Sequence, residues 1–492
     1  MNDTADSSTA EKTVYDVDVE KAGSGNQHQH EENAVAHKKL IRKLDLTLLP
    51  ILCAIYLLSY LDRSNIGNAK LGGLEKDIGI TQFEYQWGLS IFFFGYVIFE
   101  LPSNIVLRRW KASKWIAILM FCWGVVAVCM VGITNFAGLA ICRFLLGAFE
   151  AGLFPGVIYY MSLWYPRKEQ AVRLGFFWSF SSLAGAFGGL LAYGISQIKG
   201  SLAEWQYIFL IEGLPTVALA ILCWFILPDS PETAKFLNEN ERAYEINRLA
   251  TDAGAANDHS WSWAQVGSVF KDWKTYAYMV IYITGTIALQ GVTLFLPSII
   301  NGLGHWSPVK SQLMTVPPYA VAFFATIFLC ISSDHFVERS FHMVFINMIT
   351  IVGFLLLLLV DDSLIGVHYF GAILVTAGVY ANVSVKIAWF NNNFGGLTRR
   401  AVASAAIVSF GTIGGAIGGQ IYYDPPKYLG GNIIAVSCVA LQTVLVIILR
   451  VVFTWENRRR SRLTPEQKEQ EVARYGGIEL AGDRHPDFTY TL

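Results

Sequence analysis

The sequence predicts an all-α membrane protein in which twelve transmembrane helices form two pseudo-repeats of six. Three observations lead to this prediction. Of the 492 residues, 53% are hydrophobic and only 15% are charged, whereas a soluble domain has about 25% charged residues. Twelve apolar runs are long enough to cross a bilayer. One long polar stretch, residues 228–275, divides these runs into two groups of six.

The twelve apolar runs follow one another with short polar connections. In chain order they cover residues 45–67, 84–107, 114–134, 136–160, 172–197, 207–227, 276–300, 314–333, 341–360, 366–390, 402–423 and 431–453. The polar stretch between the two groups contains an amphipathic helix near residues 234–249. The expected organisation is a disordered polar tail over 1–37, a bundle over 38–227, a linker over 228–275, a bundle over 276–455 and a tail over 456–492.

An internal repeat supports the division into two halves. Residues 179–189 (SFSSLAGAFGG) align without a gap with residues 409–419 (SFGTIGGAIGG), and both lie in the fifth run of their group. A parallel duplication of six helices leaves this pattern, although two glycine-rich apolar helices can also resemble each other by chance. Both segments carry glycines spaced by four, which let helices approach closely in lipid. These glycines can serve static close packing, or they can provide smooth faces that slide when the two halves move.

Composition also excludes several classes of protein. All seven cysteines fall in apolar runs, which argues against a disulfide framework or a zinc site. The net charge is about −1, so nothing indicates a nucleic-acid partner. Residues 1–37 contain no apolar core, so they are not a cleavable signal peptide. The sequence contains no phosphate-binding loop, metal-ligand motif or nucleophile elbow at a position where it could support catalysis. We therefore expect no enzyme activity, no cofactor, no metal and a functional monomer.

The orientation follows from the positive charges in the connections. One side holds Lys38, Lys39, Arg42, Lys43, Arg108, Arg109, Lys111, Lys114, Arg167, Lys168, Arg173, Arg339, Arg399, Arg400, Arg458, Arg459, Arg460 and Arg462. The opposite side holds only Lys70, Lys76, Lys199, Lys310 and Lys427. Both termini and the 228–275 linker are therefore expected in the cytosol. The membrane itself is expected to be the plasma membrane. Charges in the connections 107–114 and 333–340 can hold the two halves together there, although the first can also be an ordinary positively charged cytosolic loop.

The fourth run contains two ionisable residues that the hydrocarbon core disfavours. Arg143 and Glu150 are seven residues apart, so both project from one face of a helix, with Gly147 between them. An ionised side chain at this depth costs about 2.5–3.5 kcal/mol. The pair therefore needs an aqueous cavity or partners. A purely structural ion pair remains the alternative.

The first run ends in a second polar group, formed by Asp62, Arg63 and Asn65. Counted from the outer helix ends, Asp62, Arg63 and Arg143 lie at similar depth. The two acids and two arginines are therefore expected to pair across a cleft. The alternative is that Asp62 and Arg63 only reach toward the membrane surface.

The second half offers uncharged polar residues that can line a cavity. Gln290 lies in the seventh run, and Tyr380 and Asn382 lie in the tenth, near Lys386. We expect Gln290, Tyr380 and Asn382 to contact a substrate. Polar side chains in membrane helices also serve simply to join helices, and that interpretation stays open for each of them.

Buried arginines beside buried acids are suited to coupled transport. An arginine keeps its charge and grips a carboxylate with two hydrogen bonds. When a substrate carboxylate occupies the arginine, the neighbouring acid loses its partner and holds a proton more easily. Proton binding and anion binding then favour each other, which is symport by thermodynamic linkage.

Several segments resemble the major facilitator superfamily and, within it, the anion:cation symporter family. The resemblance covers about residues 38–460, and its most specific marks are residues 61–67 (LDRSNIG), Arg143 with 150–156 (EAGLFPG), and 159–165 (YYMSLWY). Residues 422–428 (YYDPPKY) are similar to the fungal allantoate permease and nicotinic acid permease group. The connection between the second and third runs departs from the superfamily pattern, because no aspartate stands in the usual place.

The resemblance implies the major facilitator fold and import of small organic anions with protons. It implies that Asp62 and Glu150 are the protonatable acids and that Arg63 and Arg143 hold the substrate carboxylate or gate it. We therefore expect a secondary transporter that imports a vitamin-like or ureide carboxylate, such as nicotinate or allantoate, by alternating access. An exporter or drug:proton antiporter and a non-transporting membrane sensor are the alternatives.

Overall fold

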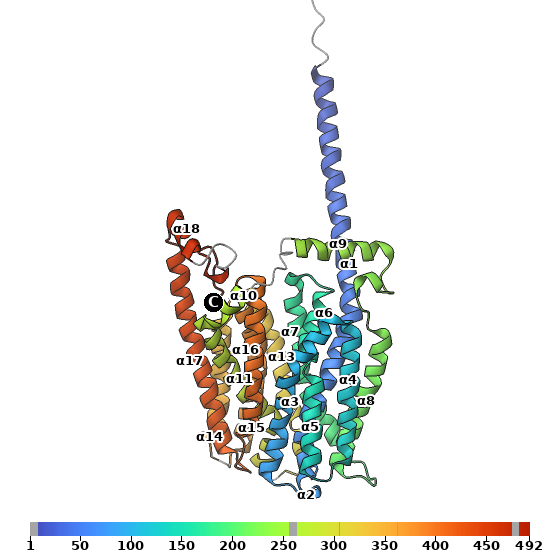
Figure 1. Cartoon of the computed structure of the whole chain (residues 1–492), viewed down its shortest axis with the longest axis vertical. Helices are drawn as coiled ribbons and strands as arrows, with labels where there is room; N and C mark the ends of the chain where they lie inside the picture. The colour runs from blue at the N-terminus through green and yellow to red at the C-terminus, as the bar shows by residue number, and fades with distance from the viewer. Residues whose placement is uncertain (1–7, 255–262, 305, 362, 475–481) are drawn as a thin grey trace, which may run out of the picture.

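The computed structural model describes residues 8–254, 263–304, 306–361, 363–474 and 482–492, and within these ranges the chain is helical with no β-strand (Figure 1). Among the described residues, twelve segments are long and apolar enough to cross a membrane, as the sequence predicts. They are His37–Leu71, Gln82–Leu107, Ala112–Gly132, Phe136–Ser162, Val172–Ile195, Glu204–Ile226, Trp273–Leu303, Pro308–His335, Ser340–Leu359, Ile365–Asn392, Arg399–Gly418 and Leu429–Arg460.

In the described part of the first half there are eight α-helices and one short 3-10 helix. They are α1 (Ser8–Leu71), α2 (Leu74–Asp77), α3 (Gln82–Arg109), α4 (Ala112–Cys129), η1 (Met130–Gly132), α5 (Phe136–Glu150), α6 (Leu153–Ser162), α7 (Arg167–Ile195) and α8 (Glu204–Ile226). Thr81 and Glu84 cap the start of α3 with reciprocal hydrogen bonds. The fourth span is divided into α5 and α6, because Pro155 has no N–H to offer to the carbonyl one turn earlier.

The second half follows a linker that contains η2 (Pro231–Thr233), α9 (Glu239–Gly254) and α10 (Trp263–Phe270). Its helices are α11 (Trp273–Leu303), α12 (Pro308–Leu313), α13 (Val316–His335), α14 (Ser340–Leu359), α15 (Ile365–Asn392), α16 (Leu397–Gly418) and α17 (Leu429–Arg460). The chain then continues through α18 (Pro465–Arg474) and η3 (Gly482–Arg484).

Of the segment predicted as a disordered tail, residues 1–7 lie outside the described residues and residues 8–37 belong to helix α1. Helix α1 begins at Ser8 and runs without interruption into the first span, and it extends well beyond the bundle in Figure 1. Nucleation is the costly step of helix formation, and each further residue adds one hydrogen bond. The membrane span provides the nucleus here, so the polar segment prolongs an existing helix.

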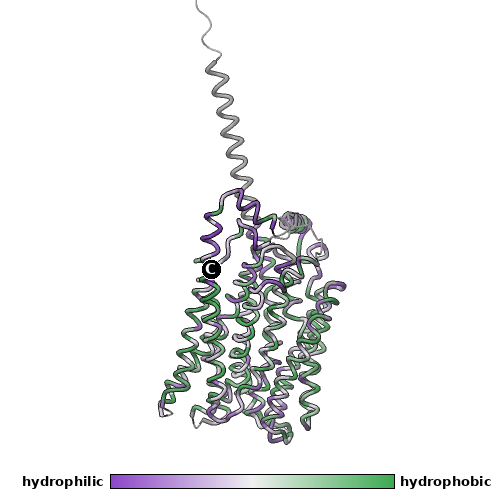
Figure 2. The backbone as a smooth tube through the Cα atoms, turned by 60° about the vertical axis from the view of Figure 1, so that its left-hand side comes forward, coloured by the Kyte–Doolittle hydropathy of each residue, from purple (hydrophilic) through white to green (hydrophobic). Residues whose placement is uncertain are grey.

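The bundle has two distinguishable ends. Helices α9 and α18 lie at one end, here called the α9 end, and α2 lies at the opposite end, here called the α2 end (Figure 1). Hydrophilic residues gather at the α9 end, and hydrophobic residues dominate along the spans (Figure 2).

The two halves meet through α1 against α11, α7 against α13 and α3 against α16. The repeated glycines lie in the last two of these contacts. A Cβ atom on Gly185 would lie 2.5 Å from the Tyr319 ring, and one on Gly189 would lie 2.7 Å from the Gln312 carbonyl oxygen. In the matching contact, Gly415 leaves no room for a side chain beside Phe93. The glycines therefore permit close packing between the halves.

Hydrogen bonds between the halves gather toward the α2 end. Gln86 donates to the carbonyl of Tyr422 at 3.1 Å, and Gln312 donates to Glu204 at 3.0 Å. At the α9 end, the charged connections bind to their own half or to the adjoining start of the linker. Lys111 bonds to Asp229, and Arg450 bonds to Glu338. Among the described residues, no hydrogen bond or ion pair of these two connections joins the halves, unlike the predicted contact between them.

Helix α9 of the linker is fastened to the first half. Lys43 of α1 pairs with Glu241 at 2.6 Å, and Arg248 pairs with Glu169 of α7 at 2.9 Å. The hydrogen bond from Lys43 is the main reason that the pKa of Glu241 is lowered.

Residues 482–492, the last part of the predicted cytosolic tail, dock onto the second half at the α9 end. Asp483 is fully buried and bonds to Lys274, and its other oxygen lies 3.0 Å from Arg399. Tyr490 stacks on Phe453 with ring centroids 4.5 Å apart. This segment therefore joins α11, α16 and α17 into one block.

We expect Asp483→Asn to lower the free energy of unfolding by about 3–5 kcal/mol, because Lys274 and Arg399 then share only the buried Asp272 and one buried charge is left uncompensated. Burial alone would raise the pKa of Asp483, but Lys274 and Arg399 hold it below its ordinary value. Its contribution to stability is therefore present above about pH 4 and is lost as the pH falls through the lowered pKa.

Thermal unfolding of the purified protein in detergent measures both the loss of stability and its pH dependence. Asp487→Asn is the control, because the side chain of Asp487 is 64% exposed and water screens its ion pair with Lys468. Equal melting temperatures for the two variants would contradict the expectation.

Candidate functional site

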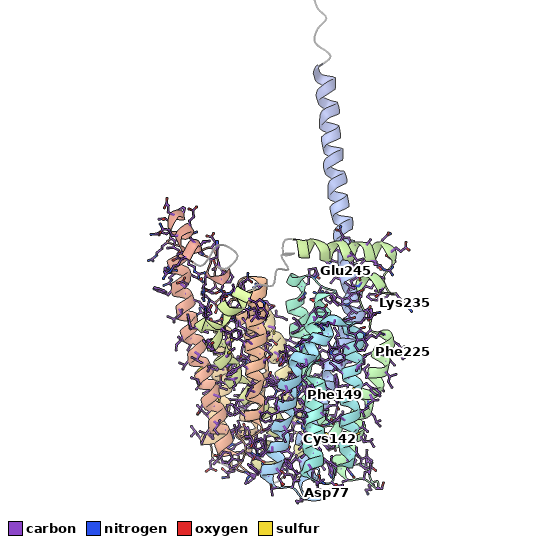
Figure 3. The ribbon with its side chains drawn as sticks, viewed as in Figure 1. Asp77, Cys142, Phe149, Phe225, Lys235 and Glu245 are labelled. Atoms are coloured by element: carbon purple, nitrogen blue, oxygen red, sulfur yellow. The ribbon has the colours of Figure 1, made fainter. Side chains whose placement is uncertain are left out.

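Helix α5 carries Arg143 and Glu150 into the interior of the first half. Arg143 is 0% exposed and Glu150 is 1% exposed. Their chain neighbours Cys142 and Phe149 mark the positions on α5 in Figure 3. Gly147 lies between them, and any Cβ atom there would overlap the carbonyl of Phe92 in α3. Glycine is therefore needed where α5 and α3 touch through their backbones.

Glu150 pairs with Arg63 of the first span. Its Oε2 atom accepts from Arg63 Nε at 3.1 Å and lies 3.1 Å from Arg63 Nη2. Its Oε1 atom accepts from Ser59 Oγ at 2.5 Å. The carboxylate thus has a partner on each oxygen, both from α1. The predicted meeting of a buried acid with a buried arginine occurs between these two residues.

Arg143 lies beside this ion pair with much of its hydrogen-bonding capacity unused. Its Nη1 atom donates to the backbone carbonyl of Arg63 at 3.3 Å, and its guanidinium carbon lies 4.9 Å from the centre of the Phe92 ring. Its Nε and Nη2 atoms have no hydrogen-bond partner among the described residues. Buried donors of a charged group without partners are costly, so Arg143 is suited to receive an anionic ligand.

Aromatic rings surround the same group. The guanidinium carbon of Arg63 lies 5.7 Å, 5.0 Å and 5.5 Å from the ring centres of Tyr60, Phe92 and Tyr96. A cation within about 6 Å of an aromatic face is stabilised by the ring. The site therefore combines two cations, one carboxylate and flat apolar walls.

Tyr380 connects the second half to this site. Its hydroxyl lies 2.9 Å from the hydroxyl of Tyr60 and 2.8 Å from Thr293 Oγ1. The sequence indicated Tyr380 but not Tyr60 or Thr293. A tyrosine or threonine within an apolar run is too common to carry a signal, and their meeting depends on how the halves dock.

Asp62 and Asn65 face away from the arginines. Asp62 Oδ2 accepts from Thr216 Oγ1 of α8 at 2.7 Å. Another acid, Glu212, lies in α8 and is 1% exposed. Because neighbouring helical residues point about 100° apart, Asp62 and Arg63 reach different helices. Glu212 was missed, although a lone carboxylate within the sixth apolar run is itself a signal.

The other predicted residues of the second half lie apart from the arginines. Asn382 bonds to Asn347 of α14, and Gln290 packs beside Gly418 of α16, with its Oε1 atom unpartnered among the described residues. The ammonium of Lys386 lies 4.6 Å from the centre of the Tyr282 ring. A pocket within the second half is lined by Gly285, Ala288, Asn347, Thr350, Val379, Asn382, Lys386, Val439 and Gln442.

Two six-helix halves with a buried charged site beside their junction define a membrane transporter rather than an enzyme. The chain belongs to the Major Facilitator Superfamily, whose family model matches residues 52–419.

Similar proteins agree with this assignment. The chain is 35% identical to the MFS-type transporter efuF of Hormonema carpetanum over 92% of this chain and 94% of the relative. It is 32% identical to the high-affinity nicotinic acid transporter of Saccharomyces cerevisiae over 92% of this chain and 84% of the relative. In fold it is similar to the crystal structure of a D-xylose-proton symporter, with a TM-score of 0.62 at 13% identity, covering 81% of this chain and 97% of the other.

Proposed function

We propose that this protein imports a small organic carboxylate together with protons. The observation that carries the proposal is the pair of buried donors on Arg143 that lack partners among the described residues and lie beside the Arg63–Glu150 ion pair. A carboxylate can accept two parallel hydrogen bonds from one guanidinium. A substrate anion would satisfy the orphan donors and supply the missing negative charge, because the group contains two arginines and one paired acid.

The same geometry suggests how a proton is coupled. A substrate carboxylate that also approaches Arg63 competes with Glu150 for that guanidinium. A carboxylate released from its arginine in an apolar site takes up a proton. When the substrate leaves, Arg63 returns to Glu150 and the proton departs. Substrate and proton therefore bind and leave together, which is the requirement for symport.

The proposed substrate is a flat or amide-rich acid such as nicotinate or allantoate. The similarity to the yeast nicotinic acid transporter supports the first of these. The rings of Tyr60, Phe92 and Tyr96 around Arg63 provide apolar faces on which a planar heterocycle can stack.

We also propose that the α9 end faces the cytosol and that the protein lies in the plasma membrane. The excess of Lys and Arg in the connections at the α9 end supports this orientation. Substrate then enters from the α2 end, which is closed in the present arrangement by contacts such as Gln86 with Tyr422 and Gln312 with Glu204.

Arg143→Lys tests the carboxylate site. A lysine cannot reproduce two-point contact, and loss of a hydrogen bond to a charged group costs about 1.5–3 kcal/mol, which is roughly tenfold or more in affinity. We expect at least this loss in uptake at low substrate concentration, measured with radiolabelled nicotinate and allantoate in expressing cells. Arg458→Lys is the control, because Arg458 is exposed at the end of α17. Uptake by Arg143→Lys equal to that of Arg458→Lys would leave Arg143 with a structural role only.

Glu150→Gln tests the coupling. Glutamine imitates the protonated acid but has no proton to release, so we expect exchange of substrate across the membrane with little dependence on pH. We expect no accumulation against a gradient, although each pH unit supplies about 1.4 kcal/mol to the parent. Counterflow measures exchange and proton-driven uptake measures accumulation, and both can be followed in the same vesicles. Glu239→Gln, at an exposed position, is the control. Several-fold accumulation by Glu150→Gln would remove this residue from coupling, and proton-driven efflux by the parent would indicate an exporter.

A cysteine at Lys235, in the linker, and a cysteine at Lys199, at the α2 end, test the orientation. Both positions are exposed. In a background that carries Cys129→Ser, an impermeant thiol reagent added to intact cells should label position 199 and not position 235. Labelling of position 235 from outside would reverse the proposed topology.

A further inference from the structure

Lys386 of α15 is a buried cation whose charge is not balanced by any described acid. It is 2% exposed, and it lines the pocket inside the second half. The centre of the Tyr282 ring lies 4.6 Å from its ammonium group, but a ring stabilises a cation without neutralising it. Among the described residues, this ammonium has no hydrogen-bond acceptor and no ion-pair partner.

The helices around the pocket offer no acid to this lysine. Residues of α11, α14, α15 and α17 line the pocket, and the first three of these helices contain no Asp or Glu. The single acid of α17 is Glu456, which pairs with Arg459 and Arg460 at the end of that helix. Of the neighbouring helices, α16 contains no acid, and Asp334 of α13 pairs with Arg339. Because an isolated buried charge is costly, the lysine needs an anion from outside the chain.

Two hydrogen-bond donors border one small space beside α11. A Cβ atom on Gly285 would lie 2.5 Å from Lys386 Nζ and 2.7 Å from Gln442 Nε2, so glycine leaves this space open. Gln442 is held in place, because its Nε2 atom donates to the carbonyl of Ile281 at 3.0 Å and its Oε1 atom accepts from Asn347 at 3.5 Å. An amide nitrogen carries two N–H groups, so one of them is left for a ligand.

The size of the pocket restricts the ligand. Its volume is about 10 Å³, which is room for about one particle of the size of a water molecule. A heterocyclic or amide-rich acid of the kind proposed above as substrate is too large for this space. A water molecule would fit but would leave the charge of the lysine unbalanced. A monatomic anion meets both requirements.

We propose that this pocket binds a monatomic anion such as chloride, with Lys386 Nζ and Gln442 Nε2 as its donors. The anion balances the lysine and joins α15 to α17 beside α11. The site lies wholly within the second half, whereas the Arg63–Glu150 pair lies in the first. It therefore does not depend on the proposed function.

Thermal unfolding of the purified protein in detergent tests the proposal. Chloride is exchanged for gluconate at constant ionic strength, because gluconate is too large for the pocket. A ligand that binds only the folded state stabilises it by mass action, so the melting temperature should rise by about 1–2 °C for each tenfold increase in chloride above its dissociation constant. Equal melting temperatures in the two salts would mean that the pocket holds only water and would overturn the proposal.

Two variants connect this response to the pocket. Lys386→Met removes the charge and keeps an unbranched side chain, and Gly285→Ala fills the space between the donors without changing the charge. Both should lose the response to chloride. The matched controls are Lys271→Met, at an exposed position, and Gly267→Ala, where an added Cβ atom meets nothing within 4 Å. Both controls should keep the response, and a response retained by Lys386→Met or by Gly285→Ala would overturn the proposal.

A direct measurement keeps the proposal testable if these variants fold poorly. Bromide carries the same charge as chloride and scatters X-rays anomalously. Crystals of the parent protein grown in sodium bromide should show an anomalous peak between Lys386 and Gln442. Anomalous maps without a peak at this position would overturn the proposal.

Discussion

The ion pair between Arg63 and Glu150 constrains much of this structure, because neither charge is tolerated alone in an apolar interior. A buried ion pair is stable only when the remaining hydrogen bonds are also satisfied. Ser59 satisfies the second oxygen of Glu150, and aromatic rings cover the guanidinium of Arg63. The pair fixes α1 against α5, and Gly147 lets α5 rest on α3 close enough for Phe92 to contact both arginines. An anion that competes for Arg63 therefore acts on the packing of three helices at once.

The two halves are each tied together at the α9 end and are joined to each other mainly toward the α2 end. Arg248 and Glu169 fasten the linker helix to the first half, and Asp483 with Lys274 fastens the last residues to the second. Between the halves, the hydroxyls of Tyr60 and Tyr380 meet near the charged site. This distribution suits alternating access, in which two rigid bodies rock about a site at their junction.

Much of this arrangement could be predicted from sequence, because the hydrocarbon core of a membrane requires long apolar helices and disfavours isolated charges. Helix number, the repeat and the burial of Arg143 with Glu150 follow from run lengths and from the cost of charge in lipid. Which acid meets which arginine depends on helix rotation, and sequence spacing does not determine rotation. For that reason Asp62 was expected beside the arginines, whereas it lies with Thr216 and Glu212. The docking of residues 482–492 depends on a few separate contacts, which leave no periodic pattern to detect.

The glycine contacts between the halves also bear on the speed of movement. At Gly67 a Cβ atom would lie 2.8 Å from the backbone carbonyl of Leu294, so backbone meets backbone there. At this contact no side chain has to change rotamer before the two backbones part. Polar contacts such as Gln86 with the Tyr422 carbonyl also join the halves at the α2 end, and water can satisfy these atoms as soon as they separate. A seam of this kind favours frequent, brief openings over rare and long-lived ones.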